Sequence, residues 1–128
     1  MAAGHTSGER SGVVYNAGDT VVADLFRPRS NNAYNYSTGV YTAENDHAYI
    51  LDIFYLSNSS EETLAFVIDG VTQPRSVWDR ISGFKDKHGS HWHTLKSNIF
   101  YMNQGQRWWF RNTVNSIKYF DLVWSLFT

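Results

Sequence analysis

The stretch His47-Ala48-Tyr49-Ile50-Leu51-Asp52-Ile53-Phe54-Tyr55-Leu56 decides the fold of this chain. It is rich in β-branched and aromatic residues and lacks helical spacing, so it predicts a β-strand. Alternate residues of a strand point to opposite faces. One predicted face carries four apolar side chains, Tyr49, Leu51, Ile53 and Tyr55. The other face is also apolar, with Ala48, Ile50, Phe54 and Leu56 around Asp52.

A strand that is apolar on both faces needs cover on both sides. Without helices to supply it, a partner subunit is the simplest cover for the second face. We therefore expect an oligomer interface, and we assign to it Tyr49, Leu51, Ile53, Tyr55 and, from a later strand, Tyr101.

The strand pattern recurs on both sides of this stretch, and helical spacing is absent. The predicted strands are 12–16, 19–26, 39–43, 47–56, 63–69, 75–81, 92–102, 106–112 and 118–127. Asp69-Gly70 and Asn103-Gln104-Gly105 are predicted turns, because glycine accepts positive φ. Many short strands with closely spaced turns indicate an all-β sandwich, jelly roll or small barrel.

Two late strands show which faces are apolar. In 118–127 the predicted apolar face consists of Phe120, Leu122, Trp124 and Leu126. In 106–112 one face carries Trp108 and Phe110, and the other carries Arg107, Trp109 and Arg111. The period of two therefore predicts that 106–112 has one face in the core and one outside it.

Composition bounds the remaining possibilities. The chain has 128 residues, no cysteine and a formal net charge of −1 at pH 7. This length suits one domain, which we place at 13–128 behind a flexible N-terminal arm at 1–12. Without cysteine there is no disulfide framework or thiolate site. The balanced charge gives no indication of nucleic-acid binding, and no apolar stretch approaches the ~20 residues of a membrane span.

The segment Tyr34-Asn35-Tyr36-Ser37-Thr38-Gly39-Val40-Tyr41-Thr42-Ala43 resembles the "Y-N-x-S-T-G-x-F-T-A" stretch of the globular heads of the C1q and tumour necrosis factor-like superfamily. Further features follow in the order of that family: the aromatic strand 48–53, the strand and turn at 66–70, and the late segment 99–108. The chain then ends in an aromatic strand, 119–127. The resemblance covers about residues 13–128.

This resemblance implies a jelly-roll β-sandwich of about ten antiparallel strands that assembles as a homotrimer. It also implies a non-catalytic domain that binds a cell-surface protein or a glycan.

The candidate ligand-binding residues are Arg107, Trp109 and Arg111. An indole between two guanidinium groups suits stacking on a sugar ring, while the arginines bind carboxylate or sulfate oxygens. The alternative is that Trp109 packs at a subunit contact and the arginines are solvated or paired with acids.

A candidate metal cluster consists of His88, His91 and His93, because His91 and His93 share a face when the segment is a strand. Zinc needs three or four converging ligands, which His88, a carboxylate or a threefold axis would have to complete. Exposed loop imidazoles or a pH-sensing role are the alternatives.

The sequence carries no motif of a known catalytic type, so we expect neither an enzyme nor a cofactor. The first hypothesis is a homotrimeric binding domain in an extracellular setting. The second is a viral or phage structural protein, such as a fibre head at the particle surface. The third is a monomeric carbohydrate-binding β-sandwich, whose exposed tryptophans would form a sugar platform.

Overall fold

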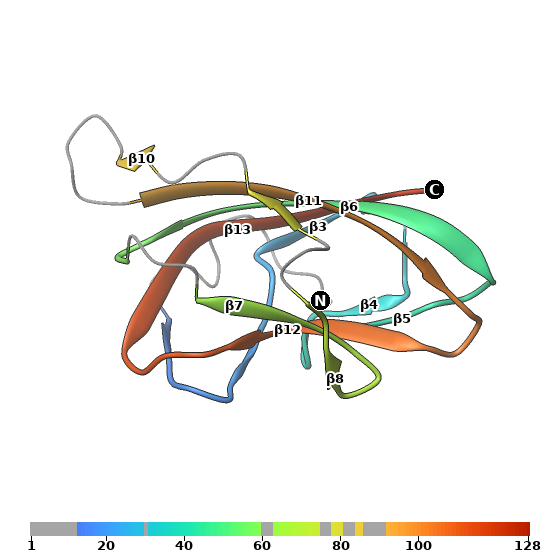
Figure 1. Ribbon diagram of the computed structural model, residues 1–128, viewed down its shortest axis with the longest axis horizontal. Helices are drawn as coiled ribbons and strands as arrows, with labels where there is room; N and C mark the ends of the chain where they lie inside the picture. The colour runs from blue at the N-terminus through green and yellow to red at the C-terminus, as the bar shows by residue number, and fades with distance from the viewer. Residues whose placement is uncertain (1–12, 30, 60–62, 75–77, 81–83, 86–91) are drawn as a thin grey trace.

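The computed structural model describes residues 13–29, 31–59, 63–74, 78–80, 84–85 and 92–128. Two β-sheets lie face to face, with the large sheet above the small one in Figure 1. The described residues contain no helix. The prediction of an all-β sandwich is therefore confirmed.

The two sheets contain seven and six strands. The large sheet consists of β1 (Val14–Tyr15), β3 (Leu25–Arg27), β6 (His47–Ser57), β9 (Trp78–Arg80), β10 (Phe84–Lys85), β11 (Trp92–Met102) and β13 (Ile117–Phe127). The small sheet consists of β2 (Thr20–Val21), β4 (Tyr34–Asn35), β5 (Val40–Thr42), β7 (Leu64–Ile68), β8 (Val71–Thr72) and β12 (Arg107–Asn112).

The strand order is that of a jelly roll. Three strand pairs are nested in the sequence: β7–β8 lies between the members of β6–β11, which in turn lie between the members of β5–β12. The pairing of β6 with β13 extends the large sheet, and the pairing of β7 with β12 extends the small one. One pair departs from the all-antiparallel prediction, because β3 runs parallel to β13. The cause is the path of the chain, since β2 runs antiparallel to β12 in the small sheet and the chain then crosses to the large sheet as β3.

The long predicted strands are confirmed. The prediction of one strand at 19–26 is wrong, because this segment splits into β2 and β3 in different sheets. Of the predicted strand 75–81, the described part is β9. The strands that the pattern did not predict, β4, β8 and β10, have two residues each, too short for any periodicity.

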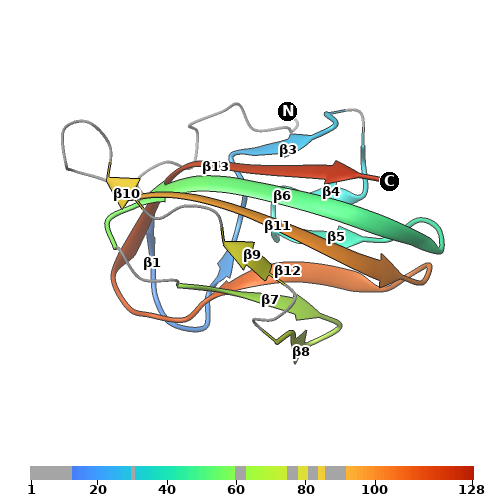
Figure 2. The same ribbon diagram turned by 45° about the horizontal axis from the view of Figure 1, so that its top comes forward.

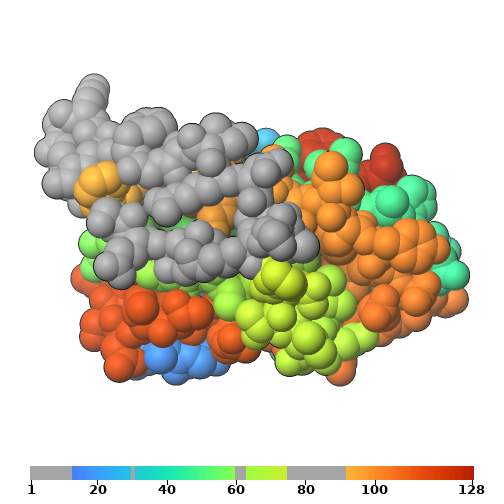
Figure 3. Space-filling view, in the orientation of Figure 1, coloured from blue at the N-terminus to red at the C-terminus, as the bar shows by residue number. Residues whose placement is uncertain are grey.

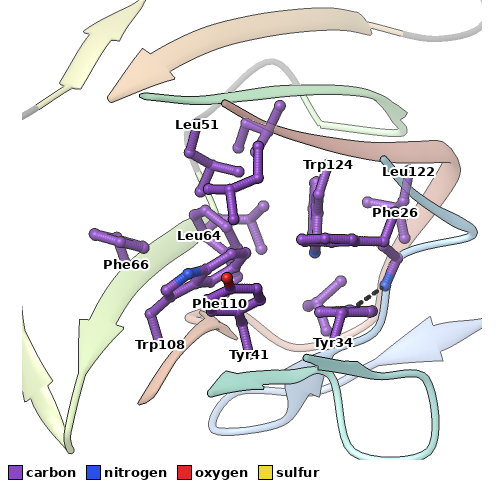
Figure 4. Packing of buried hydrophobic residues seen from close by; sticks show 14 of the residues in the cluster. Phe26, Tyr34, Tyr41, Leu51, Leu64, Phe66, Trp108, Phe110, Leu122 and Trp124 are labelled. Carbon is purple, nitrogen blue, oxygen red and sulfur yellow. Dashed lines mark hydrogen bonds between the residues drawn. The ribbon is translucent and has the colours of Figure 1, made fainter. Parts of the chain in front are cut away.

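Aromatic rings fill the space between the sheets. Trp108 lies at the centre with no exposed surface, and six ring centroids lie 5.4–6.4 Å from its own. Figure 4 shows several of these rings together with Trp124, Leu51 and Leu122, which come from the large sheet. Rings at such separations contribute beyond the area they bury. Much of the aromatic surplus of the sequence therefore belongs to the core.

A β-bulge in β13 corrects one predicted face. The pairing of β13 with β6 shifts between Phe120 and Val123, and Asp121 has a φ of 53°. The extra residue moves Phe120 out of the buried row that contains Leu122. The buried Asp24 stabilises the bulge, because its Oδ2 accepts a hydrogen bond of 3.0 Å from the Leu122 N–H.

Candidate functional site

The outward face of β12 carries the predicted ligand-binding residues. Trp108 and Phe110 point into the core. On the opposite face Arg107 is exposed, and Trp109 and Arg111 are half-buried. The predicted alternation is therefore confirmed. Residues two apart on one strand are about 6.8 Å from each other, so the indole lies between two guanidinium-bearing positions.

Contacts with the neighbouring strands orient one of these arginines. Arg111 Nη2 donates a hydrogen bond of 2.9 Å to the hydroxyl of Thr72, so its side chain crosses β7 to reach β8. On β7, Val67 lies opposite Trp109 and is buried. Figure 3 shows the side chains of residues 63–74 directly beside those of the β11–β12 region. Arg111 is thus held along the sheet surface by a neutral partner.

Arg107 begins β12 and is hydrogen-bonded to the turn between β7 and β8. Its N–H donates to Asp69 Oδ1 at 3.0 Å, and the side-chain amide of Gln106 donates to the second carboxylate oxygen at 3.1 Å. Asp69 and Gly70 form the predicted turn, with positive φ values of 47° and 83°. The Asp69 carboxylate therefore holds a backbone N–H and an amide at the start of β12, from which the exposed side chain of Arg107 extends.

The structure corrects the predicted interface residues of β6. Four of them, Tyr49, Leu51, Ile53 and Tyr55, point into the sandwich and are at most 4% exposed. They pack inside the single chain, so they offer no surface to a neighbouring subunit. The opposite face of β6 is the outer one, with Ile50 exposed and Phe54 half-buried. Periodicity did not show which face lay inward, because both were apolar.

The strand β11 departs from the usual alternation over part of its length. Three of its inward positions, Thr94, Lys96 and Asn98, are polar and at most 5% exposed, whereas the inward Phe100 and Met102 pack in the apolar core. Its outward positions include Leu95, Ile99 and Tyr101, which are 39%, 72% and 60% exposed. The predicted interface residue Tyr101 therefore does lie on the outer surface. Figure 2 shows β3, β13, β6 and β11 side by side in this sheet.

Three adjacent rows of outward side chains cross the middle of the large sheet. One apolar row joins Phe127, Ile50 and Ile99, and another joins Val123, Phe54 and Leu95. Between them runs a polar row of Arg27, Ser125, Asp52 and Ser97. We call these three rows, together with Tyr101, the outer face. A hollow of about 300 Å³ lies in it, lined by both apolar and polar members of the rows.

The histidine cluster falls largely outside the described residues, since His88 and His91 belong to the segment 86–91. His93 is described, half-buried on β11, with its ring centroid 6.2 Å from that of Phe54. Across the described ranges, no three His, Asp or Glu side chains are arranged to hold a metal ion. The metal site therefore stays a prediction.

A second hollow, of about 290 Å³, opens at the end of the sandwich near the loop between β5 and β6. Its walls include Tyr41 and Tyr49, and it is also lined by the exposed Glu44 and His47. Burial raises the pKa of Tyr41 to about 12, so this hydroxyl is a neutral hydrogen-bonding group near pH 7. No local pattern in the sequence predicts this hollow, because its lining comes from separate segments.

The stretch Tyr34–Ala43 has a structural role. Tyr34 lies in the core, stacked on Phe26 at 4.6 Å, and its hydroxyl accepts a hydrogen bond of 2.9 Å from the Ala23 N–H. The Tyr36 hydroxyl accepts a bond of 2.8 Å from the Phe26 N–H. Gly39, with a φ of 78°, packs against the backbone of residue 21. The residues that carry the family resemblance therefore attach β4 and β5 to the first strands.

Comparisons with known proteins add no relationship to this geometry. A scan against models of protein families finds no match for the chain, and neither does a search of curated protein sequences. In the part of the chain that the structure describes, no helix has the length and apolarity of a membrane span. The proposed function therefore depends on two surfaces. One is the outer face, and the other is the outward face of β12 with Arg107, Trp109 and Arg111, which we call the β12 face.

Proposed function

We propose that this chain is a non-catalytic binding domain, similar to C1q and tumour necrosis factor-like heads, that assembles as a homotrimer through its outer face. The observation that carries this proposal is the set of exposed apolar side chains on the outward face of β11. Leu95, Ile99 and Tyr101 point away from the core, while Thr94 and Lys96 point into it. A strand arranged in this way exposes apolar area to water unless another chain covers it.

Two further observations support a second copy as the cover. The apolar side chains are in register on β13, β6 and β11, so they adjoin one another rather than being scattered. The formal net charge of −1 leaves little long-range repulsion between copies. The resemblance of residues 34–43 to trimeric heads supplies the number of copies.

The variant Ile99→Asp is expected to convert the trimer into a monomer without unfolding it. Ile99 is 72% exposed in the single chain, so the substitution opens no cavity, but in the assembly it buries an unpaired carboxylate. Light scattering behind size exclusion measures the mass. The matched control is Val71→Asp, because Val71 is 62% exposed on β8 of the other sheet. A trimeric Ile99→Asp protein, or equal disruption by both variants, would contradict the assignment.

The β12 face stays free in such an assembly, because it belongs to the opposite sheet. We assign to it the contact with a surface partner that presents carboxylate or sulfate groups, on a glycan or on a protein. Arg107 and Arg111 supply planar donors for these groups. The half-buried indole of Trp109 supplies a stacking surface between them.

Removing this chemistry is expected to weaken binding to a sulfated polysaccharide such as heparin. Arg107→Gln and Arg111→Gln each remove one charged contact, with a roughly tenfold loss of affinity, and Trp109→Ala removes the stacking surface. Surface plasmon resonance on immobilised heparin provides the measurement. The control is Lys118→Gln, because Lys118 is exposed on β13 of the large sheet and its loss changes the net charge equally.

The control separates a site from bulk attraction. Equal weakening by Lys118→Gln would indicate that net charge alone holds the polysaccharide. No binding by the unmodified chain would contradict this ligand class.

The setting implied by this proposal is extracellular or the surface of a virus particle. A fibre-head protein would use the same outer face for assembly. A monomeric carbohydrate-binding sandwich would not, and a monomeric mass of the unmodified chain would favour it over both trimeric forms.

A further inference from the structure

The polar row of the outer face contains an acid, Asp52, with an apolar row on each side of it. Asp52 is half-buried on β6, with Ile50 and Phe54 as its neighbours on the same face of the strand. The Ser97 hydroxyl donates a hydrogen bond of 2.6 Å to Asp52 Oδ1. This bond orients the carboxylate but does not neutralise it. An interface that covers the outer face must therefore supply a cation or bear the cost of desolvating the anion.

The same row contains a cation two strands away. In the sheet register, Ser125 of β13 lies opposite Arg27 of β3 on one side and opposite Asp52 of β6 on the other. Two strand spacings place the Arg27 and Asp52 backbones about 9.6 Å apart. Both residues line the hollow of about 300 Å³, and Arg27 also lines a neighbouring hollow of about 340 Å³ with Pro28 and Phe127. Each chain therefore presents both signs of charge on its outer face, whose other members are uncharged.

The two charges lie on different parts of the outer face, so they suit a contact in which one part of a copy meets a different part of the next copy. Arg27 is exposed on β3, which among the described strands pairs with β13 alone and forms an edge of the large sheet. Asp52 lies on β6, which has β13 and β11 on its two sides. In a cyclic assembly each contact joins a different patch of each copy, such as the edge of one to the centre of the next.

We propose that the Arg27 guanidinium of one copy pairs with the Asp52 carboxylate of the next copy and fixes how the two outer faces align. This inference rests on the proposed self-association. Charge complementarity selects a second copy as the occupant, because each chain carries both members of the pair. The apolar rows on either side exclude water and strengthen the pair. A misaligned contact would bury the Asp52 carboxylate without a cation, so the pair disfavours other registers.

The test begins with two charge reversals, Arg27→Asp and Asp52→Arg. Each variant is expected to assemble at least about tenfold more weakly than the unmodified chain, because two like charges then meet across the contact. Asp52→Asn keeps the shape of the side chain and should weaken assembly less. The control is Lys118→Glu, which reverses an exposed charge on β13 and should assemble normally. Thermal melting establishes that each variant is folded.

Mixing the two reversed variants distinguishes a pair between copies from a pair within one chain. In the mixture, every contact between unlike variants joins opposite charges, and every contact between like variants joins like charges. A cyclic trimer built from the two variants keeps one contact between like variants, so native mass spectrometry is expected to show mixed dimers and fewer mixed trimers, whereas each variant alone stays largely monomeric. The double variant R27D/D52R should also assemble, because it restores opposite charges at every contact.

The outcomes separate this inference from the proposed function. An unmodified chain that assembles while both reversals leave it unchanged overturns the ion pair and keeps the trimer. A double variant that assembles, beside a mixture that shows no dimer of the two unlike variants, would place the pair within one chain, which also overturns the inference. A monomeric unmodified chain overturns both the pair and the proposed function.

Discussion

Replacement of Trp108 by alanine is expected to lower the free energy of unfolding by about 3–5 kcal/mol. The side chain has no exposed surface and is surrounded by six aromatic rings. Its loss leaves a cavity that several rigid rings cannot fill without moving together. Because domains are stable by only about 5–15 kcal/mol, the variant should be close to unfolding at about 37 °C.

The matched control is the neighbouring residue. Trp109→Ala removes the same side chain from the opposite face of β12, where it is half-buried, and should cost about 1 kcal/mol. Urea unfolding followed by circular dichroism measures both values. Trp108→Phe keeps a ring in the core and removes an indole N–H that has no hydrogen-bond partner among the described residues, so it should recover most of the loss. Equal losses at 108 and 109 would mean that the two faces of β12 are wrongly assigned.

Gly39→Ala is expected to cost about 3–4 kcal/mol for a different physical reason. Gly39 has a φ of 78°, which strains any residue with a Cβ. A Cβ at this position would also lie 2.8 Å from the Val21 carbonyl oxygen and 3.2 Å from the Thr20 and Val22 side chains. Relief of these contacts would separate the β4–β5 hairpin from β2 and the residue that follows it, which adds an overpacking cost to the backbone strain.

A second glycine isolates the backbone contribution. Gly105 has a similar φ of 87°, but a Cβ there would meet nothing within 4 Å. Gly105→Ala should therefore cost only about 1–2 kcal/mol in the same unfolding experiment. A cost at position 39 no larger than that at position 105 would remove the close approach to Val21 as the reason for glycine.

Much of the sandwich was predictable because long strands carry a strong period of two. The segments 47–56, 92–102 and 106–112 each became one strand of nearly the predicted length. The Asp69-Gly70 turn was also predictable from a local feature. Gly70 has a positive φ, which few residues other than glycine accept. The outward placement of Arg107, Trp109 and Arg111 followed directly from the alternation in β12.

The remaining features depend on contacts between distant segments. The bulge at Asp121 breaks the alternation of β13, and its partner Asp24 lies almost a hundred residues earlier in the chain. The crossing from β2 to β3 occurs within an apolar segment that carries no turn signal. The inward face of β6 was ambiguous because both faces are apolar, and the polar inward positions of β11 run against the usual pattern.

The candidate site was predictable in part for the same reasons. Periodicity placed the β12 residues on one surface, but it gave no information on Thr72, which orients Arg111 from a two-residue strand. The polar row that joins Arg27 to Asp52 depends on the parallel pairing of β3 with β13. That register is set by the whole fold, so no local pattern in the sequence contains it.

The absolute molar mass of the unmodified chain in solution, measured by light scattering behind size exclusion, tests the central claim most directly. The expected result is a mass near three times the 14.7 kDa of one chain, maintained on dilution through the micromolar range. A mass of one chain at all concentrations would contradict assembly through the outer face. A mass of two chains would contradict the trimer.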